Sequence, residues 1–195
     1  MSRGGLLIWN DCAAEALADY ERWYEEEHLP ERVGLPGYRS GARYEALAGT
    51  APRFFTLYET ASPEVFLSPA YLSKLAKPTP WTQAIMPNFT GMSRTVCRQV
   101  GSRGRSVAGA LVTLPEVSPE PLDEEVLGWS LWQAAGPPPT PTAEMALRSG
   151  ADGTVASCLL LHLARPEEAQ ALAARHSSAG AYRLLSLLRH EEVAT

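Results

Sequence analysis

The sequence has few cysteines and no long apolar run, and both absences narrow the class of protein. Three cysteines in 195 residues are too few and too far apart for a disulfide framework or a zinc knuckle. The longest apolar run, SCLLLHLA at 157–164, falls far short of the roughly 20 residues that a membrane-spanning helix needs. The run at 6–9 is too short for a signal peptide. We therefore expect a soluble, cytoplasmic protein with no bound metal and no membrane partner.

Basic residues are also scarce. The chain has 17 Lys and Arg against 22 Asp and Glu, for a formal net charge of −5. Binding to a phosphate backbone requires clustered positive charge, so we expect no nucleic-acid partner. Hydrophobic residues make up 45% of the chain, which is typical of a globular protein with a substantial core.

Apolar periodicity predicts the order β-α-β-β-α-β for the first half of the chain. The predicted strands are 4–10, 38–47, 53–60 and 88–100. The predicted helices are 12–28 and 62–76. Pro30 should end the first helix at His28, and Pro69 should kink or break the second. Pro78 and Pro80 indicate an extended loop that presents Trp81.

The same order is expected for the second half, beyond the glycine-rich junction at 101–106. The predicted strands are 107–114, 143–150, 154–164 and 181–192, and the predicted helices are 119–135 and 165–176. The clearest echo between the halves is LYETASPEVF (57–66) against LHLARPEEAQ (161–170).

This order of elements predicts an α+β fold made of tandem ferredoxin-like repeats, residues 1–100 and 101–195. Each repeat would leave one sheet face bare, and the two bare faces would pack as a two-sheet α/β barrel within one chain. Both a monomer and a homodimer of such fused barrels remain open. Because 13 of the 16 aromatic residues lie in the first 100 positions, we expect the first half to bear the site and the second to be mainly a structural partner.

One face of the first predicted helix combines aromatic and ionisable side chains. Its members are Tyr20, Trp23, Tyr24 and Glu27, with His28 at the edge. His28 is either a proton carrier beside a pocket or a helix-end residue stabilised by the helix dipole. A carboxylate carried inward at Glu27 must find a donor or stay protonated.

The strands that follow carry further candidates. Arg39 and Arg43 share one strand face and can hold a carboxylate or enolate oxygen. Alternatively, they form ion pairs with Glu45 or Glu59 or are simply exposed at a rim. Aromatic and amide groups that can contact a ligand are Tyr44, Tyr58, Trp81 and Asn88. If they do not contact a ligand, the tyrosines are core residues. Trp81 either closes a cavity as a lid or fills the end of the core.

The stretch DYERWYEEEHLPERVGLPGYRSGARYEA (19–46) resembles the opening helix and second strand of EthD-like proteins of the dimeric α/β-barrel superfamily. RFFTLYE (53–59), SPAYLSKL (68–75) and KPTPWTQAIMPNFTGMSRTV (77–96) resemble uncharacterised proteins near that family. The resemblance covers residues 5–100, whereas residues 101–195 share the architecture only. It implies the barrel fold, in a superfamily that includes cofactor-independent monooxygenases, isomerases, decarboxylases and haem proteins.

The hypothesis from sequence is a cofactor-independent isomerase, decarboxylase or monooxygenase that acts on a small hydrophobic or aromatic compound. His28 carries the proton, Glu27 orients it or acts as an acid, and Arg43 with Tyr44 polarises a substrate oxygen. The alternatives are a non-catalytic ligand-binding or structural barrel and, third, a haem-binding barrel with His162 as the ligand.

Overall fold

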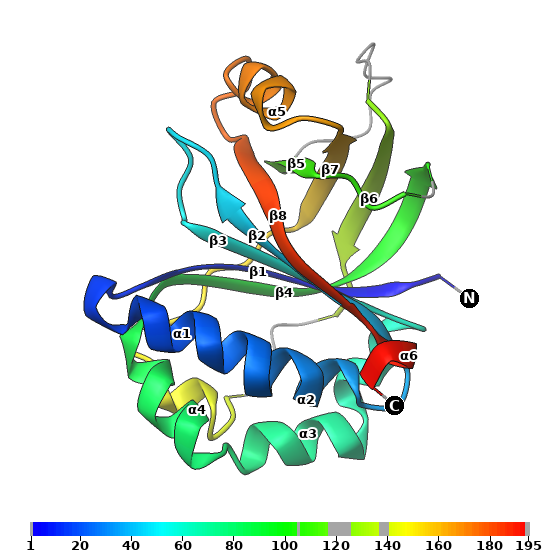
Figure 1. The fold of residues 1–195 in the computed structure, drawn as a ribbon. Coiled ribbons are helices and arrows are strands. Elements are labelled where there is room, and N and C mark those ends of the chain that lie inside the picture. Colours follow the sequence, from blue (N-terminus) through cyan, green and yellow to red (C-terminus); the bar gives the residue numbers. More distant parts are fainter. Residues whose placement is uncertain (1, 105, 117–125, 137–140, 194–195) are drawn as a thin grey trace.

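The computed structural model describes residues 2–104, 106–116, 126–136 and 141–193, and its centre is a closed barrel of eight antiparallel strands (Figure 1). The strands are β1 (Gly4–Cys12), β2 (Tyr38–Ala46), β3 (Phe54–Thr60), β4 (Phe89–Arg103), β5 (Ala110–Pro115), β6 (Gly128–Ala134), β7 (Ser157–Leu163) and β8 (Gly180–Arg189). The helices are α1 (Leu17–Trp23), α2 (Leu29–Val33), α3 (Pro69–Ala76), α4 (Pro80–Ile85), α5 (Pro166–Ala173) and α6 (His190–Val193). None of the helices in the described ranges has the length and apolar character to cross a bilayer.

The barrel order is β1-β3-β2-β8-β5-β7-β6-β4. The first half contributes β4-β1-β3-β2, and the second contributes the equivalent order β8-β5-β7-β6. Hydrogen-bonded ladders join β2 to β8 and β4 to β6, so the two sheets form one continuous barrel. The first half has the predicted order β-α-β-β-α-β. The division into tandem repeats at residue 100 stays a prediction.

The second half differs from the prediction in two elements. The expected helix at 119–135 lies partly outside the described residues, and its end is strand β6. Here the side chains alternate with the period of a strand, since Leu131 packs in the outer core under α5 and Trp132 packs inside the barrel. The expected strand at 143–150 is a loop with one helical turn, Met145–Leu147.

The first helix continues past its predicted end at His28. Residues Tyr24–His28 form a wide helical turn in which the Leu29 N–H bonds to the Tyr24 carbonyl, five residues back, and α2 then runs to Val33. Pro30 occupies the first turn of α2, where no intrahelical N–H is required. His28 therefore lies in the middle of a helical segment, and its interpretation as a helix-end residue is wrong.

The predictions for Pro69 and for the Pro78–Pro80 segment have different outcomes. The break at Pro69 is confirmed, because a short helix, Pro63–Leu67, ends just before α3 begins at Pro69. The extended loop around Trp81 is wrong. The Thr79 side chain accepts a hydrogen bond from the Thr82 N–H, and Pro80 opens helix α4, which carries Trp81.

Strand alternation divides the core between the barrel interior and the layer under helices α1–α4. Trp9, Tyr44 and Phe55 fill the barrel. Leu6, Ile8, Phe54 and Tyr58 face the helices, together with Tyr20, Trp23 and Tyr24 from the helical segment. Figure 1 shows these helices packed along one side of the barrel and α5 at the opposite end.

Gly41 on β2 allows the helical segment to approach the barrel closely. A Cβ at this position would lie 2.6 Å from Leu29 Cδ1 and 2.9 Å from Val33 Cγ2. Gly41→Ala should therefore lower the free energy of unfolding by about 1–3 kcal/mol, the usual cost of overpacking, as measured by urea denaturation. Gly153→Ala is the control, because its added Cβ meets Ser93 at an ordinary 3.4 Å. Equal stability of the two variants would contradict this packing.

Candidate functional site

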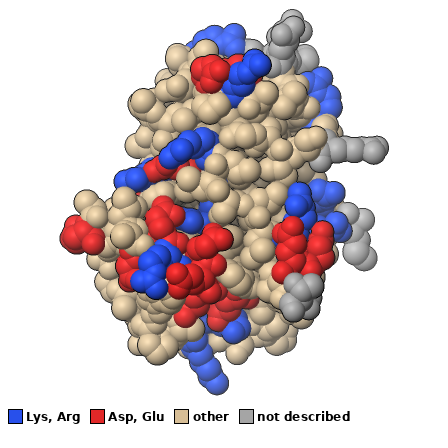
Figure 2. Space-filling model, viewed as in Figure 1, with Lys and Arg blue, Asp and Glu red and all other residues tan. Residues whose placement is uncertain are grey.

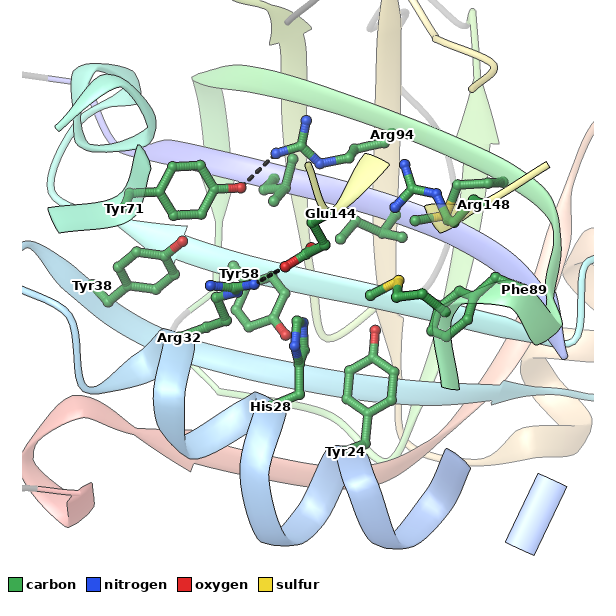
Figure 3. A pocket seen from close by; sticks show the side chains of 14 residues that line it. Tyr24, His28, Arg32, Tyr38, Tyr58, Tyr71, Phe89, Arg94, Glu144 and Arg148 are labelled. Carbon is green, nitrogen blue, oxygen red and sulfur yellow. Dashed lines mark hydrogen bonds and ion pairs between the residues drawn. The ribbon is translucent and has the colours of Figure 1, made fainter. Parts of the chain in front are cut away.

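A polar cavity of about 30 Å³ lies between the helical layer and the barrel wall (Figure 3). Its lining residues are Leu6, Ile8, Tyr24, His28, Arg32, Tyr38, Tyr58, Tyr71, Met86, Phe89, Met92, Arg94, Glu144 and Arg148. One water molecule requires roughly 10–15 Å³ by the same kind of measure. The cavity therefore accommodates two waters or a small polar group, and not a multi-ring ligand.

One helical face supplies three of the polar lining groups. Tyr24, His28 and Arg32 are spaced four residues apart, and the labelled side chains point from the helix into the cavity (Figure 3). The His28 ring stacks on Trp23 with centroids 4.2 Å apart and meets Tyr24 edge-on at 5.2 Å. These rings fix the imidazole, whose buried Nδ1 has no hydrogen-bond partner among the described residues.

The surroundings of His28 favour its neutral form. Burial lowers the pKa of His28 well below its usual value of 6.5, and the positive charges of Arg32 and Arg43 lower it further. At neutral pH the imidazole is therefore uncharged. A neutral imidazole with a free ring nitrogen can accept a proton.

The strands and α3 add hydroxyl and guanidinium donors. Burial raises the pKa of Tyr38 and Tyr58 well above 10, so both hydroxyls stay protonated, and neither has a hydrogen-bond partner. Arg94 on β4 donates to the Tyr71 hydroxyl, while its Nη1 has no partner. The cavity thus has more buried donors than acceptors.

The loop between β6 and β7 closes the site with residues from the second half. The Glu144 N–H bonds to the Leu75 carbonyl at 3.0 Å, and the Glu144 carboxylate forms a buried ion pair with Arg32 (Figure 3). Arg148 from the same loop pairs with Asp152 at 2.6 Å. The second half, which we expected to be mainly structural, supplies two lining side chains.

Three of the residues predicted for the site line this cavity: His28, Tyr24 and Tyr58. Glu27, predicted to assist His28, lies outside the lining and accepts hydrogen bonds from the hydroxyls of Thr79 at 2.5 Å and Thr82 at 3.3 Å. The Glu27 carboxylate therefore accepts hydrogen bonds from Thr79, the N-cap residue of α4, and from Thr82 in the same helix. In this structure it supports the helices and does not contact His28.

Arg43 also lies outside the cavity. Its guanidinium stands 4.1 Å from the centroid of the Tyr24 ring and pairs with Glu21 at 3.0 Å. It lines an open surface groove with Glu21, Glu25 and Glu26. Acidic side chains are prominent on the same side of the molecule as the helices (Figure 2). The guanidinium groups inside the cavity are Arg32, Arg94 and Arg148.

The other predicted contacts are dispersed. Tyr44 faces the barrel interior, and Arg39 is exposed. The hydrogen bonds of the remainder are Tyr20 with Asn10, Trp23 with Thr82, Trp81 with Asp19, and Asn88 with the carbonyls of Ala84 and Ile85. These side chains pack or cap the helical layer and do not line the cavity.

Sequence reasoning missed most of the charged lining groups. The four-residue spacing from Tyr24 through His28 indicates Arg32 once the helix is allowed to continue past Pro30. The sequence pattern around Glu144 and Arg148 carries no such signal, because a loop far along the chain folds back to place them.

Comparison with known proteins identifies the fold. No family model matches the chain, and no curated protein matches it. An anthrone oxidase-like protein superposes with a TM-score of 0.63 at 9% identity, covering 98% of this chain and 94% of that one. A proposed monooxygenase of Fusobacterium nucleatum gives 0.54 at 8% identity, covering 96% and 94%. A proposed chlorite dismutase gives 0.56 at 10% identity, covering 100% and 98%. These similarities show the dimeric α/β-barrel fold.

The residues of the site do not fit a haem. A volume of about 30 Å³ is an order of magnitude below the roughly 300 Å³ at which pockets for cofactors and drug-sized ligands begin. His162 lies on β7, away from this cavity. Among the described residues, no three His, Cys, Asp or Glu side chains are placed to hold a metal ion.

The pKa of His28 predicts a pH-dependent stability. The folded state keeps the imidazole neutral, whereas the unfolded chain binds a proton near pH 6.5. As the pH falls below about 6.5, the free energy of unfolding should therefore decrease, by at most about 1.4 kcal/mol per pH unit. Urea denaturation at pH 7.5 and pH 5.5 measures this loss. His28→Gln should reduce it, and an identical pH dependence in the variant would contradict a neutral His28.

Glu144→Gln removes the closest carboxylate partner of the buried Arg32 and leaves Glu31, at 3.4 Å, as the other. We expect a loss of about 1–3 kcal/mol in the free energy of unfolding, because a buried charge loses its closest partner. Glu26→Gln is the control, because its pair with Arg22 is exposed and worth about 0–1 kcal/mol. Chemical denaturation of both variants tests this difference. A loss below about 1 kcal/mol for Glu144→Gln would show that the pair does not secure the loop.

Proposed function

We propose that the protein is a cofactor-independent enzyme that removes a proton from a small hydrophobic or aromatic compound, with His28 as the proton carrier. The observation that carries this proposal is the buried imidazole, whose unpartnered Nδ1 belongs to a cavity rich in free donors. A general base must be unprotonated at the working pH and must lie within hydrogen-bond reach of the proton that it removes. His28 is neutral at pH 7 because its pKa is lowered, and its side chain lines the cavity.

The chemistry follows from the groups around the imidazole. A C–H bond beside a carbonyl breaks, the proton passes to His28, and the electron pair moves onto the carbonyl oxygen as an enolate. The hydroxyls of Tyr38 and Tyr58, which have no hydrogen-bond partner among the described residues, then stabilise the negative oxygen. They take the role that we expected for Arg43 and Tyr44. Isomerisation returns the proton at another carbon. In oxygenation the enolate carbon forms a bond to O₂ and gives a peroxide, which takes up a proton and loses water to leave a new carbonyl.

The fold supports this class of reaction. An anthrone oxidase-like protein and a proposed monooxygenase share it, and anthrone carries an acidic CH₂ group beside its carbonyl-conjugated rings. We include in the proposal the EthD-like character of residues 5–100, the origin of the chain as two fused ferredoxin-like repeats, and a cytoplasmic location. Since the fused barrel needs no second chain to close, a monomer or a homodimer of barrels fits the proposal equally.

The small volume of the cavity favours one second candidate, a barrel that binds a small ligand without turnover. About 30 Å³ admits the reacting group of a substrate but not its whole body. Under this alternative His28 serves as a hydrogen-bonding group for the ligand, and its replacement changes affinity alone.

Deuterium exchange tests proton removal without requiring knowledge of the product. Phenylpyruvate and phenylacetone, two enolisable compounds with a single aromatic ring, are incubated with the protein in anaerobic D₂O, and loss of the acidic protons is followed by NMR. We expect the wild type to accelerate exchange of at least one compound and His28→Gln to reduce that acceleration by at least about 100-fold, the usual contribution of a general base.

His176→Gln is the matched control, because His176 lies beyond the end of α5 and outside the cavity. Its exchange rate should equal that of the wild type. Circular dichroism and melting temperature confirm that both variants are folded at the assay temperature. Equal exchange by wild type and His28→Gln would refute His28 as the proton carrier, and no acceleration by the wild type would favour the ligand-binding barrel.

A further inference from the structure

The polar cavity adjoins a second, larger hollow. A groove of about 320 Å³ lies on the side of the β6–β7 loop. Besides two arginines, its lining comprises the mainly apolar residues Pro141, Met145, Ala146, Gly150 and Ala151 together with Asp152 and Thr154. Arg94 and Arg148 line both the groove and the cavity. Two guanidinium groups therefore stand where an apolar groove meets a polar interior.

Arg94 is buried, and no carboxylate among the described residues forms an ion pair with it. Its side chain is only 6% exposed and donates a hydrogen bond to the Tyr71 hydroxyl, while Nη1 has no partner in the part of the chain that the structure describes. A buried charge normally has an ionic partner, because the loss of hydration is otherwise uncompensated. An anion from outside the chain would supply what Arg94 lacks.

The other charges around the cavity do not provide that partner. Glu144 acts on Arg94 through its charge but forms its direct ion pair with Arg32, and Asp152 pairs with Arg148 at 2.6 Å. Arg148 keeps a buried Nε without a partner. The free donors at the junction are therefore N–H groups of two guanidinium ions, which match the oxygens of a carboxylate in geometry and in charge.

We propose that the junction of groove and cavity binds the carboxylate of an amphipathic organic acid. The carboxylate lies between Arg94 and Arg148, and the apolar body of the acid occupies the groove beside Met145 and Pro141. As the identity of a substrate, this inference rests on the proposed function. As a binding site, it is independent of turnover, since it depends on the two arginines and not on His28.

Binding of matched probes tests the site. Phenylacetate, its neutral analogue phenylacetamide, and acetate are titrated into the wild-type protein by isothermal titration calorimetry at pH 7.5. We expect phenylacetate to bind at least about tenfold more tightly than phenylacetamide, because only the anion compensates Arg94. Acetate should bind at least about tenfold more weakly than phenylacetate, because it leaves the groove empty.

Variants locate the binding. Arg94→Gln and, separately, Arg148→Gln should weaken phenylacetate by at least about tenfold and leave phenylacetamide nearly unchanged. Arg98→Gln is the matched control on the same strand, since Arg98 is half-exposed and paired only loosely with Glu64 at 3.9 Å. Arg148 belongs to a loop, so its variant keeps the test valid if Arg94→Gln fails to fold.

Three results would overturn the proposal: equal affinity for the acid and the amide, unchanged phenylacetate binding in the Arg148→Gln variant, or a loss in Arg98→Gln as large as in the cavity variants. Equal affinity for acetate and phenylacetate would remove the groove from the site. Because binding is measured without turnover, each of these outcomes is independent of the exchange experiment on His28→Gln.

Discussion

The buried ion pair between Arg32 and Glu144 is the interaction on which the candidate site depends. It joins the helical segment of the first half to a loop of the second half, more than a hundred residues away in sequence. A buried pair of this kind adds little net stability over an apolar contact, but leaving one partner alone is costly. The pair therefore keeps the β6–β7 loop over the cavity. The same loop also places Arg148 in the cavity lining.

The same charges set the chemistry of His28. Arg32 stands one helical turn from the imidazole, and Arg43 lies behind Tyr24, so both guanidinium groups oppose protonation of the ring. Burial against Trp23 acts in the same direction. A residue that titrates near neutrality in water thus becomes a base that is unprotonated at physiological pH. Arg43 contributes through its field and its stacking without lining the cavity.

Barrel closure decides which side chains can meet. Each strand sends alternate residues inward and toward the helices, and the ladders from β2 to β8 and from β4 to β6 fix that alternation around the whole sheet. Tyr44 and Tyr58, which look equivalent in the sequence, are separated by this rule: one fills the barrel and the other reaches the cavity. The aromatic residues of the first half therefore serve two cores, and only some of them reach the site.

Periodicity and proline spacing by themselves determined the four strands and the two helical regions of the first half, because those signals are local. They also placed Tyr24 and His28 on one helical face. Tertiary structure decided the rest: the wide turn that carries the helix past Pro30, the identity of β6, and the loop that brings Glu144 and Arg148 to the cavity. These features depend on contacts between segments that lie far apart in the sequence. A local residue pattern does not specify such contacts. The proposed function depends on these features, since the charged groups around His28 and Arg94 meet only in the folded barrel.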